Sequence, residues 1–367
     1  MTAILTIIVL VLITIAIWQM VKIFDLSQMN ADRSQVANDK DNNINGYLMI
    51  MFVIFIHVLT VVSFWKWSDV LLPESASEHG VLTDKLLAIS FAVIFFVQTI
   101  TQILLHYFAF KYRGEKGKKA LFYADNNKLE IIWTVIPVIV LAGLIISGLF
   151  AWNDITSITK TDDDLEIELY AQQFGWQARY AGQDNVLGDA NVRLINIDKA
   201  NALGVDVNDP NAQDDIIVQE IHLPVGKKAI FKMRSQDVLH SAYMPHFRQQ
   251  MNCVPGQVTE FAFVPTITTK EMRENETIVN KVNKINEIRL ANNEKIAKEN
   301  RGLPKEEQMP RLEPYEFDYL LLCNKICGKS HYNMQLKIIV ETQEEYENWI
   351  KQQKTFKESV AVNYEIN

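Results

Sequence analysis

Residues 323–334 read CNKICGKSHYNM, a short run that sets two cysteines, a histidine and a methionine at intervals of four, four and three residues. Soft sulfur donors beside an imidazole are the ligand types of copper electron-transfer sites. A second run, DVLHSAYMP at residues 237–245, supplies another imidazole, His240, from about eighty residues upstream. Two loops of a β-sandwich can bring such distant runs together. The two runs therefore predict a metal site built on a β-sandwich.

A simpler interpretation of the same residues is available. Two cysteines four residues apart, outside the cytoplasm, can form a disulfide, and a lone histidine or methionine usually serves packing. The complete set of donor types in order favours the metal site. The chain has only three cysteines, so no disulfide framework holds it together. The third, Cys253, is predicted to pack in a turn that leads into a strand.

Charge divides the 367-residue chain into two parts. Residues 1–150 carry 11 acidic and 11 basic side chains, whereas residues 151–367 carry 33 acidic and 25 basic ones, so the whole net charge of −8 lies on the second part. The first part is predicted to be a membrane anchor and the second an acidic, water-soluble domain.

Uncharged apolar runs predict four membrane-spanning helices. Several of these runs end in tryptophan, which favours the membrane interface. A cleaved signal peptide is the alternative for the first run, but it lacks a basic start and a small-x-small cleavage site, so a retained span is predicted. The four runs are Met1–Val21, Tyr47–Trp65, Leu86–Phe110 and Ile131–Trp152.

The connection between the third and fourth runs is strongly basic. The positive-inside rule places such a loop in the cytoplasm, so both termini and the soluble domain are expected on the periplasmic side of a bacterial inner membrane. The basic residues are Lys111, Arg113, Lys116, Lys118, Lys119 and Lys128.

After Trp152 the sequence changes to short alternating segments bounded by Gly, Pro, Asn and Asp. This pattern predicts an antiparallel β-sandwich, and apolar residues at helical spacing in Glu344–Lys354 predict a closing helix. The predicted strands are Leu165–Tyr170, Ile216–Leu223, Lys228–Met233, Gln257–Val264, Phe317–Leu322 and Leu336–Val340.

Two segments do not fit a compact sandwich. Residues 181–215 are rich in Asn, Asp and Gly, which predicts a long acidic loop. Residues 270–311 alternate charged and apolar residues at helical spacing, which predicts an exposed amphipathic helix or hairpin. We expect this segment to project from the domain and contact a partner protein, in preference to being a disordered linker.

The two ligand runs, together with the helix that opens EIIWTVIP at residues 130–137, resemble subunit II of the haem–copper cytochrome c oxidases over roughly two-thirds of the chain. The resemblance implies a membrane-anchored all-β protein: a transmembrane helical part followed by a cupredoxin-like Greek-key β-barrel or sandwich. Residues 1–66 would be two additional spans and residues 84–152 the transmembrane hairpin of the family. Residues 153–367 would be the periplasmic copper domain, with 270–311 inserted.

The resemblance also implies a ligand set and an activity. Cys323 and Cys327 would bridge two copper ions of a CuA centre; His240 and Met334 would complete one ion, and His331 with the backbone carbonyl of Lys325 the other. The centre would accept electrons from cytochrome c and pass them singly to haem in subunit I, where oxygen is reduced to water and protons are pumped.

Departures from the family pattern limit finer expectations. Lys325 stands where many relatives have a glutamate that binds magnesium or manganese, so no magnesium is expected through this residue, and its ammonium group is expected in the vacated region. Phe174 stands where relatives often have an electron-entry tryptophan, so Phe174 and Trp176 are entry candidates, with simple packing as the alternative. Glu130 matches a glutamate at a proton-path entrance, with a helix-dipole role as the alternative.

The implied partners are oxidase subunits I and III and a cytochrome c or tethered cytochrome c domain; no nucleic acid is expected. An acidic surface fits a basic cytochrome. Because Asn252 and Gln236 replace acids that relatives often carry, the docking patch is expected to shift toward Asp162–Asp164, Glu166, Glu168 and residues 206–215. The added spans and the 270–311 insertion are expected to hold further partners, such as a quinol-oxidising complex in a supercomplex.

Two other functions account for fewer of these features. A copper-free structural subunit of a quinol oxidase would keep the helices and barrel but lose the ligands, which are all present here. A stand-alone copper carrier would not explain four spans or the Glu130 helix.

Overall fold

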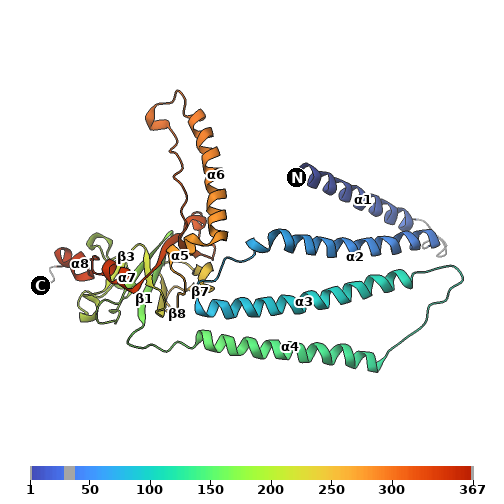
Figure 1. The fold of residues 1–367 in the computed structure, drawn as a ribbon, viewed down its shortest axis with the longest axis horizontal. Coiled ribbons are helices and arrows are strands. Elements are labelled where there is room, and N and C mark those ends of the chain that lie inside the picture. The colour runs from blue at the N-terminus through green and yellow to red at the C-terminus, as the bar shows by residue number, and fades with distance from the viewer. Residues whose placement is uncertain (1, 29–37, 365–367) are drawn as a thin grey trace. The chain divides into compact units, whose positions relative to one another are not determined.

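The computed structural model describes residues 2–28 and 38–364, and the chain divides into two compact units (Figure 1). One unit comprises residues up to 68 together with 91–137. The other comprises 69–90 and everything from 138 onward. The helices α3 and α4 each contribute one end to each unit.

Four long helices make up the N-terminal part: α1 Thr2–Gln28, α2 Asp39–Trp67, α3 Glu78–Lys111 and α4 Asn127–Thr156. Among the described residues, α2, α3 and α4 are long and apolar enough to cross a membrane. The first expected span falls in α1, whose described side chains form the shorter apolar stretch Val9–Ile23. Three of the four predicted spans thus coincide with span-length helices, and the remaining span, the first in the sequence, stays a prediction.

The start of α2 is tied to the predicted cytoplasmic connection between α3 and α4. The side chain of Asn38 caps α2 by accepting from the backbone N–H of Asp41. Arg113 Nε donates to Asn43 Oδ1 at 2.7 Å, and the backbone N–H of Lys116 donates to Asp39 Oδ1 at 2.9 Å. These contacts join the added helix α2 to the helices of the hairpin.

The C-terminal part is a sandwich of two five-stranded sheets, as predicted, but each sheet contains one parallel pair where a purely antiparallel sandwich was predicted. The first sheet has the order β3-β2-β1-β5-β8, in which only β1 and β5 run parallel. Its strands are β1 Leu165–Gln172, β2 Gly175–Tyr180, β3 Ile216–Val218, β5 Ala229–Ser235 and β8 Thr259–Phe263.

The second sheet has the order β4-β10-β9-β6-β7, in which only β4 and β10 run parallel. Its strands are β4 Ile221–Pro224, β6 His240–Met244, β7 Gln249–Cys253, β9 Tyr319–Cys323 and β10 Gln335–Glu341. This pair of mixed sheets is the cupredoxin-like sandwich that the sequence resemblance implied.

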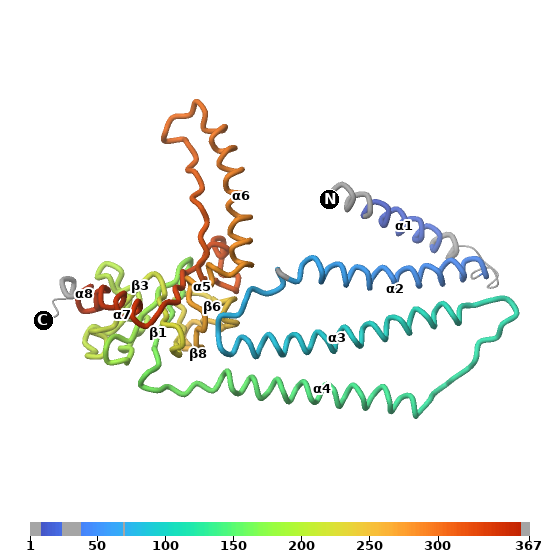
Figure 2. Tube along the Cα trace, viewed as in Figure 1, coloured from blue at the N-terminus to red at the C-terminus, as the bar shows by residue number. Residues whose placement is uncertain are grey.

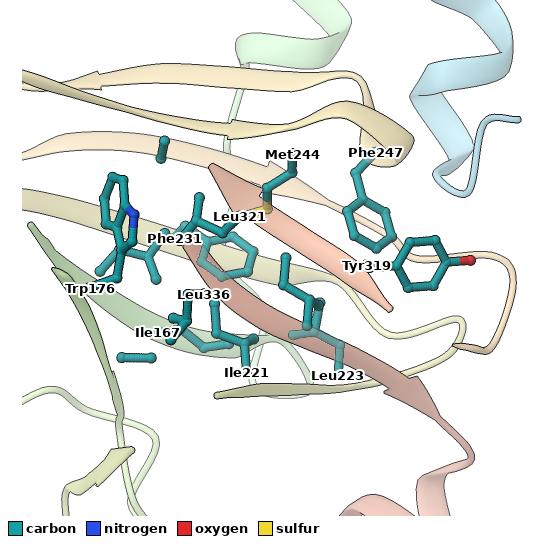
Figure 3. Close-up of a cluster of buried hydrophobic side chains, with 14 of the residues drawn as sticks. Ile167, Trp176, Ile221, Leu223, Phe231, Met244, Phe247, Tyr319, Leu321 and Leu336 are labelled. Atoms are coloured by element: carbon teal, nitrogen blue, oxygen red, sulfur yellow. The ribbon is translucent and has the colours of Figure 1, made fainter. Parts of the chain in front are cut away.

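Apolar side chains from the two sheets meet in one core (Figure 3). Ile167 and Phe231 from the first sheet, with Ile221 and Leu321 from the second, have no exposed surface. Burying a side chain of this size stabilises a fold by about 1.5–3 kcal/mol. The core therefore supplies a rigid base for the loops at either end of the strands.

One predicted strand was wrong in a way that matters for the topology. Ile216–Leu223 is not a single strand, because the chain leaves β3 at Val218 and re-enters as β4 at Ile221 in the opposite sheet. Its apolar residues line the core from both sides, and only the two polar residues Gln219 and Glu220 separate them at the crossing. The strands β2, β6 and β7 were not predicted.

The acidic segment 181–215 is an ordered structure built from turns. Arg179, buried on β2, forms ion pairs with Glu168 at 2.6 Å and with Asp215 at 2.7 Å. Leu203 and Val205 from the segment pack in a small second core with α8, Phe356–Tyr364. The predicted closing helix is α7, Gln343–Ile350, and α8 adds a second helix that covers the acidic segment.

The insertion forms a helical arm. The short α5, Thr269–Glu274, leads into α6, Glu276–Glu299, and the chain then returns beside α6 in extended form, as Figure 2 shows. Hydrogen bonds join two asparagines on α6 and the C-cap Asn300 to the returning backbone. Each asparagine donates to the carbonyl of one residue and accepts from the N–H of that same residue. The pairs are Asn286 with Tyr315, Asn293 with Leu312 and Asn300 with Met309, at 2.6–3.0 Å. This asparagine ladder defines the arm, residues 276–316.

The base of the arm belongs to the sandwich. Met272 on α5 and Ile278 at the start of α6 are 1% and 4% exposed and pack in the main core. Arg273 binds the carbonyl of Phe317 and the carboxylate of Asp318, both at 2.8 Å. The prediction of a helix or hairpin is confirmed, and its first turns are part of the barrel.

Candidate metal centre

The residues of the two ligand runs meet at one end of the second sheet. His240 begins β6, Cys323 ends β9, and the two strands are antiparallel neighbours. The backbone N–H of Asn324 donates to the carbonyl of Ser241 at 3.0 Å, and the N–H of Cys323 donates to the carbonyl of Met334 at 3.1 Å. Backbone hydrogen bonds alone therefore fix the ends of both loops.

The donor atoms lie within a few ångströms of one another. Sγ of Cys323 lies 3.7 Å from Nδ1 of His240 and 3.9 Å from Sγ of Cys327. Sγ of Cys327 lies 3.6 Å from Nδ1 of His331 and 3.8 Å from Sδ of Met334. All five side chains named from the sequence are thus brought together.

These distances fit ligands that share metal ions. Sulfur and nitrogen ligands about 2.0–2.3 Å from a tetrahedral ion lie about 3.3–3.8 Å from each other. His240, Cys323 and Cys327 were also found as a buried group whose ligand atoms lie within 4.8 Å of one another. Two thiols, two imidazoles and a thioether form a soft donor set, which suits copper better than magnesium or calcium.

The backbone carbonyl of Lys325 completes the set. Its oxygen lies 3.2 Å from Sγ of Cys323, while the side chain of Lys325 is exposed. A carbonyl ligand does not depend on the side chain that follows it. A lysine at position 325 therefore leaves this donor in place.

The ring of His240 is oriented from behind by Asp237. Nε2 of His240 lies 2.8 Å from Oδ1 of Asp237, which leaves Nδ1 facing the thiol of Cys323. Burial alone would raise the pKa of Asp237, but hydrogen bonds from His240 and from two backbone N–H groups outweigh it and lower that pKa. An ionised carboxylate behind a ligating histidine fixes its tautomer and raises its basicity as a ligand.

The thiol of Cys327 is protonated in the absence of metal. Burial, together with the neighbouring Cys323, raises its pKa to about 11. Metal binding must therefore displace a proton from this thiol, as is usual for thiolate ligands.

The two electron-entry candidates occupy different positions. Trp176 on β2 is 4% exposed, and its ring lies edge-on to that of His240 with centroids 6.2 Å apart. Phe174 is half-buried in the β1–β2 turn, against Gly328 of the cysteine loop. Of the two candidates, Phe174 is the one that combines an accessible surface with contact to the cysteine loop.

The expected acidic docking patch is wrong for three of its residues on β1 and directly before it, whereas Asp162 and Asp163 are exposed, as a docking patch requires. Asp164, Glu166 and Glu168 are only 3–7% exposed, and each is paired with lysine or arginine. In the 206–215 segment Asp215 is fully buried, and other carboxylates there accept hydrogen bonds from backbone N–H groups. The buried acids neutralise internal cations, so little of their charge faces a partner. The patch stays a prediction for Asp162, Asp163 and the half-buried carboxylates of the 206–215 segment.

Glu130 lies in the first turn of α4, in the other unit of the chain. The side chain of Asn126 caps this helix by accepting from the N–H of Leu129 at 3.2 Å. Glu130 is exposed, and its position suits both a helix-dipole role and the role that the resemblance implied.

Two residues near the metal ligands were missed from the sequence as site residues. Asp237 lies three residues before His240, a spacing that could have indicated a carboxylate behind the ring. Gln173 contacts both ligand loops, but it is distant in sequence from each, and only the fold reveals its place.

Comparison with known proteins gives consistent findings. Residues 66–149 match the family model for the cytochrome c oxidase subunit II transmembrane domain. The chain is 31% identical over 294 residues to the alternative cytochrome c oxidase subunit 2 of Bradyrhizobium diazoefficiens, covering 80% of this chain and 85% of that relative. It is 25% identical to cytochrome c oxidase subunit 2 of Thermostichus vulcanus, covering 80% and 82%.

Among solved structures, the periplasmic domain of subunit II of cytochrome oxidase from Bradyrhizobium japonicum matches 53% of this chain and 95% of its own. The sequence identity over that match is 19% and the TM-score is 0.28.

Proposed function

Because the chain belongs to the family of cytochrome c oxidase subunit II, a component of a membrane-bound oxidoreductase, we propose that it is the subunit at which electrons enter such an oxidase. The observation that carries this proposal is the convergence of two thiols, two imidazoles, a thioether and the Lys325 carbonyl in one buried cluster. A copper-free member of the family would have no reason to keep this set.

The proposed centre holds two copper ions. Cys323 and Cys327 would bridge them, with His240 and Met334 on one ion and His331 and the Lys325 carbonyl on the other. Such a centre supplies a one-electron carrier with little change of structure between its redox states. The protein contributes rigidity: the ligands stand on paired strands over a fully buried core.

Electrons would enter at Phe174 and leave toward haem in subunit I, where oxygen is reduced to water with proton pumping. The contact of Phe174 with Gly328 supports this role for Phe174, and the ring contact of Trp176 with His240 supports an inner position along the same route. The donor would be a cytochrome c or a tethered cytochrome c domain, and subunits I and III would be the membrane partners. Glu130 would lie near the cytoplasmic entrance of a proton path in subunit I.

The membrane arrangement is proposed as four spans, with both termini and the copper domain in the periplasm of a bacterial cell. Residues 1–66 would be the two additional spans, 84–152 the family hairpin, and 153–367 the copper domain. The three span-length helices and the basic connection after α3 support this arrangement. We further propose that no magnesium binds through Lys325, since an ammonium group cannot replace a carboxylate ligand.

The arm and the added spans are proposed to hold additional partners, such as the quinol-oxidising complex of a supercomplex. Ile288 and Leu290 on α6 are 57% and 66% exposed, which supports a contact surface on the arm. Deleting residues 270–311 would also remove Met272 and Ile278 from the core, so a deletion confined to 284–313 is the cleaner test. It should weaken association with the partner complex and leave the copper spectrum unchanged.

Electron paramagnetic resonance of the purified complex, with copper analysis, tests the main proposal. One unpaired electron shared over two copper nuclei, with two copper ions per subunit beyond those of subunit I, is the expected result. A mononuclear signal, or none, would reject the two-copper centre; an intact complex without this copper would indicate the copper-free quinol-oxidase alternative.

A further inference from the structure

We propose that Gln173 is a positioning residue that joins the two ligand loops and sets the orientation of the Cys327–Gly328 peptide. The inference rests on the proposed copper centre. In it, Gln173 holds the histidine loop and the cysteine loop at a fixed distance and orientation. Gln173 itself is not proposed as a metal ligand.

Gln173 and Phe174 are the two residues of the tight turn between β1 and β2. Gln172 and Gly175 face each other as the last pair of the two strands, which fixes the turn. The end of β1 is also tied to the chain before the first ligand loop, because Ala171 pairs with Ser235 and its carbonyl accepts from the N–H of Gln236 at 2.9 Å. The turn is therefore held in place from both sides by the sheet.

From this turn Gln173 reaches both ligand loops. Its backbone N–H donates to Oδ2 of Asp237 at 2.8 Å, and the other oxygen of Asp237 holds the ring of His240. Its side-chain Nε2 donates to the backbone carbonyl of Cys327. One residue thus connects the histidine loop through its backbone and the cysteine loop through its side chain.

The cysteine loop is shaped to accept this contact. Gly328 has a φ of +143°, a backbone conformation that residues with a side chain rarely adopt. A Cβ on Gly328 would lie 2.7 Å from Cζ of Phe174 and 3.0 Å from Nε2 of Gln173. The turn and the loop therefore approach so closely that only glycine fits between them.

This geometry has a consequence for the centre. The peptide that carries the Cys327 carbonyl also sets the direction of the Cys327 side chain, so a donor on that carbonyl restrains the sulfur relative to Cys323 and His240. Partners behind the ligands typically change metal affinity or activity by roughly 10- to 100-fold when they are removed. A donated hydrogen bond beside the thiolate also favours the reduced, more negative state.

The test uses the purified complex with Gln173→Ala, Gln173→Glu and, as the matched control, Gln172→Ala. Gln172 is on the same hairpin, and its side chain makes no hydrogen bond in the described part of the chain. Gln173→Glu keeps the shape but cannot donate to the carbonyl, and it adds a negative charge. Neither Gln173 variant removes the backbone contact to Asp237.

Both Gln173 variants are expected to make the hyperfine coupling of the two copper nuclei unequal and to lower the reduction potential, with the larger decrease for Gln173→Glu. Oxidation of the donor should slow by roughly tenfold, and Gln172→Ala should change none of these. Loss of copper in both Gln173 variants, with Gln172→Ala unchanged, would also support the proposal. Wild-type spectra and potentials in both Gln173 variants would overturn it, whereas absence of a two-copper signal in the unaltered complex would instead reject the proposed function.

Discussion

The cysteine loop and the arm both connect to β9, yet the ligand loops and the arm are held by different kinds of contact. In the ligand loops, residues far apart in the sequence converge: Gln173, His240 and Cys327 meet only because three separate turns lie at one end of the sandwich. In the arm, three asparagines spaced seven residues apart meet backbone groups spaced three residues apart. The site depends on the whole fold, whereas the arm repeats one local contact along its length.

This difference determines how each region responds to change. In the convergent site, each of a few ligands is needed to bind the metal. Removing one ligand should therefore abolish metal binding. In the asparagine ladder, three similar contacts share the stabilisation of the arm. Removing one asparagine should therefore loosen the returning chain only next to that residue. The predictions that follow run from the largest expected effect to the smallest.

Replacing Cys327 by serine should remove the copper centre. A serine oxygen is a poor ligand for copper, so we expect loss of the two-copper signal and a decrease of roughly 100-fold or more in donor oxidation, measured by electron paramagnetic resonance, copper analysis and cytochrome oxidation. Cys253→Ala is the control, because Cys253 is buried but outside the donor cluster. Two copper ions retained in Cys327→Ser would contradict the assignment.

The base of the arm should be far more sensitive than its outer part. Met272→Ala removes a fully packed side chain and should lower the free energy of unfolding by about 2–5 kcal/mol. Leu290→Ala, at an exposed position of α6, should change it by less than about 0.5 kcal/mol. Denaturant unfolding of the purified complex, followed by the copper absorbance, measures both. Equal effects would mean that the base is not part of the barrel.

Acidification should destabilise the fold at the base of the arm through protonation of His246. Burial lowers the pKa of His246 to about 4 although its ring donates to the carbonyl of Glu74, and Lys281 and Arg248 add to the decrease. Since the unfolded chain binds the proton more strongly, stability is complete above about pH 6.5 and is lost as pH falls toward 4. The loss should reach about 1–3 kcal/mol.

Unfolding between pH 4 and 7 in the unaltered protein and in His246→Phe measures this contribution. Phenylalanine keeps the packing against Phe317 and Tyr319, so it should flatten the pH dependence in that range. An unchanged slope would exclude His246 as its source.

Removing one step of the asparagine ladder should have the smallest effect. Asn293→Ala breaks the two hydrogen bonds to Leu312 and should destabilise that level by about 1 kcal/mol. Hydrogen exchange at the amide of Leu312 should become about fivefold faster, while the copper spectrum stays the same. Asn292→Ala is the control, because Asn292 is the neighbouring residue on α6 and makes no side-chain hydrogen bond within the described residues. Equal exchange in the two variants would show that the ladder does not hold the returning chain.

The sequence predicted the two regions to different depths, for physical reasons. The ligands were identifiable because their chemistry is rare and their spacing is short. Gln173 was not, because its role depends on a turn that brings residue 173 to residue 327. The crossing after Val218 was missed because both flanking strands bury apolar residues, and the polar break between them, Gln219 and Glu220, is too short to indicate a change of sheet. The helix of the arm was predicted from its periodicity, but the partner of each asparagine requires the register of the returning chain.

The asparagine ladder restricts how the arm could have grown. Seven helical residues advance about 10.5 Å, and three extended residues advance about 9–10 Å. Each rung therefore consumes seven residues on the way out and three on the way back. An insertion of ten residues divided in this proportion lengthens the arm by one rung, whereas other insertions leave an asparagine without its partner. Arm lengths among relatives that share this ladder should therefore differ in steps of ten residues.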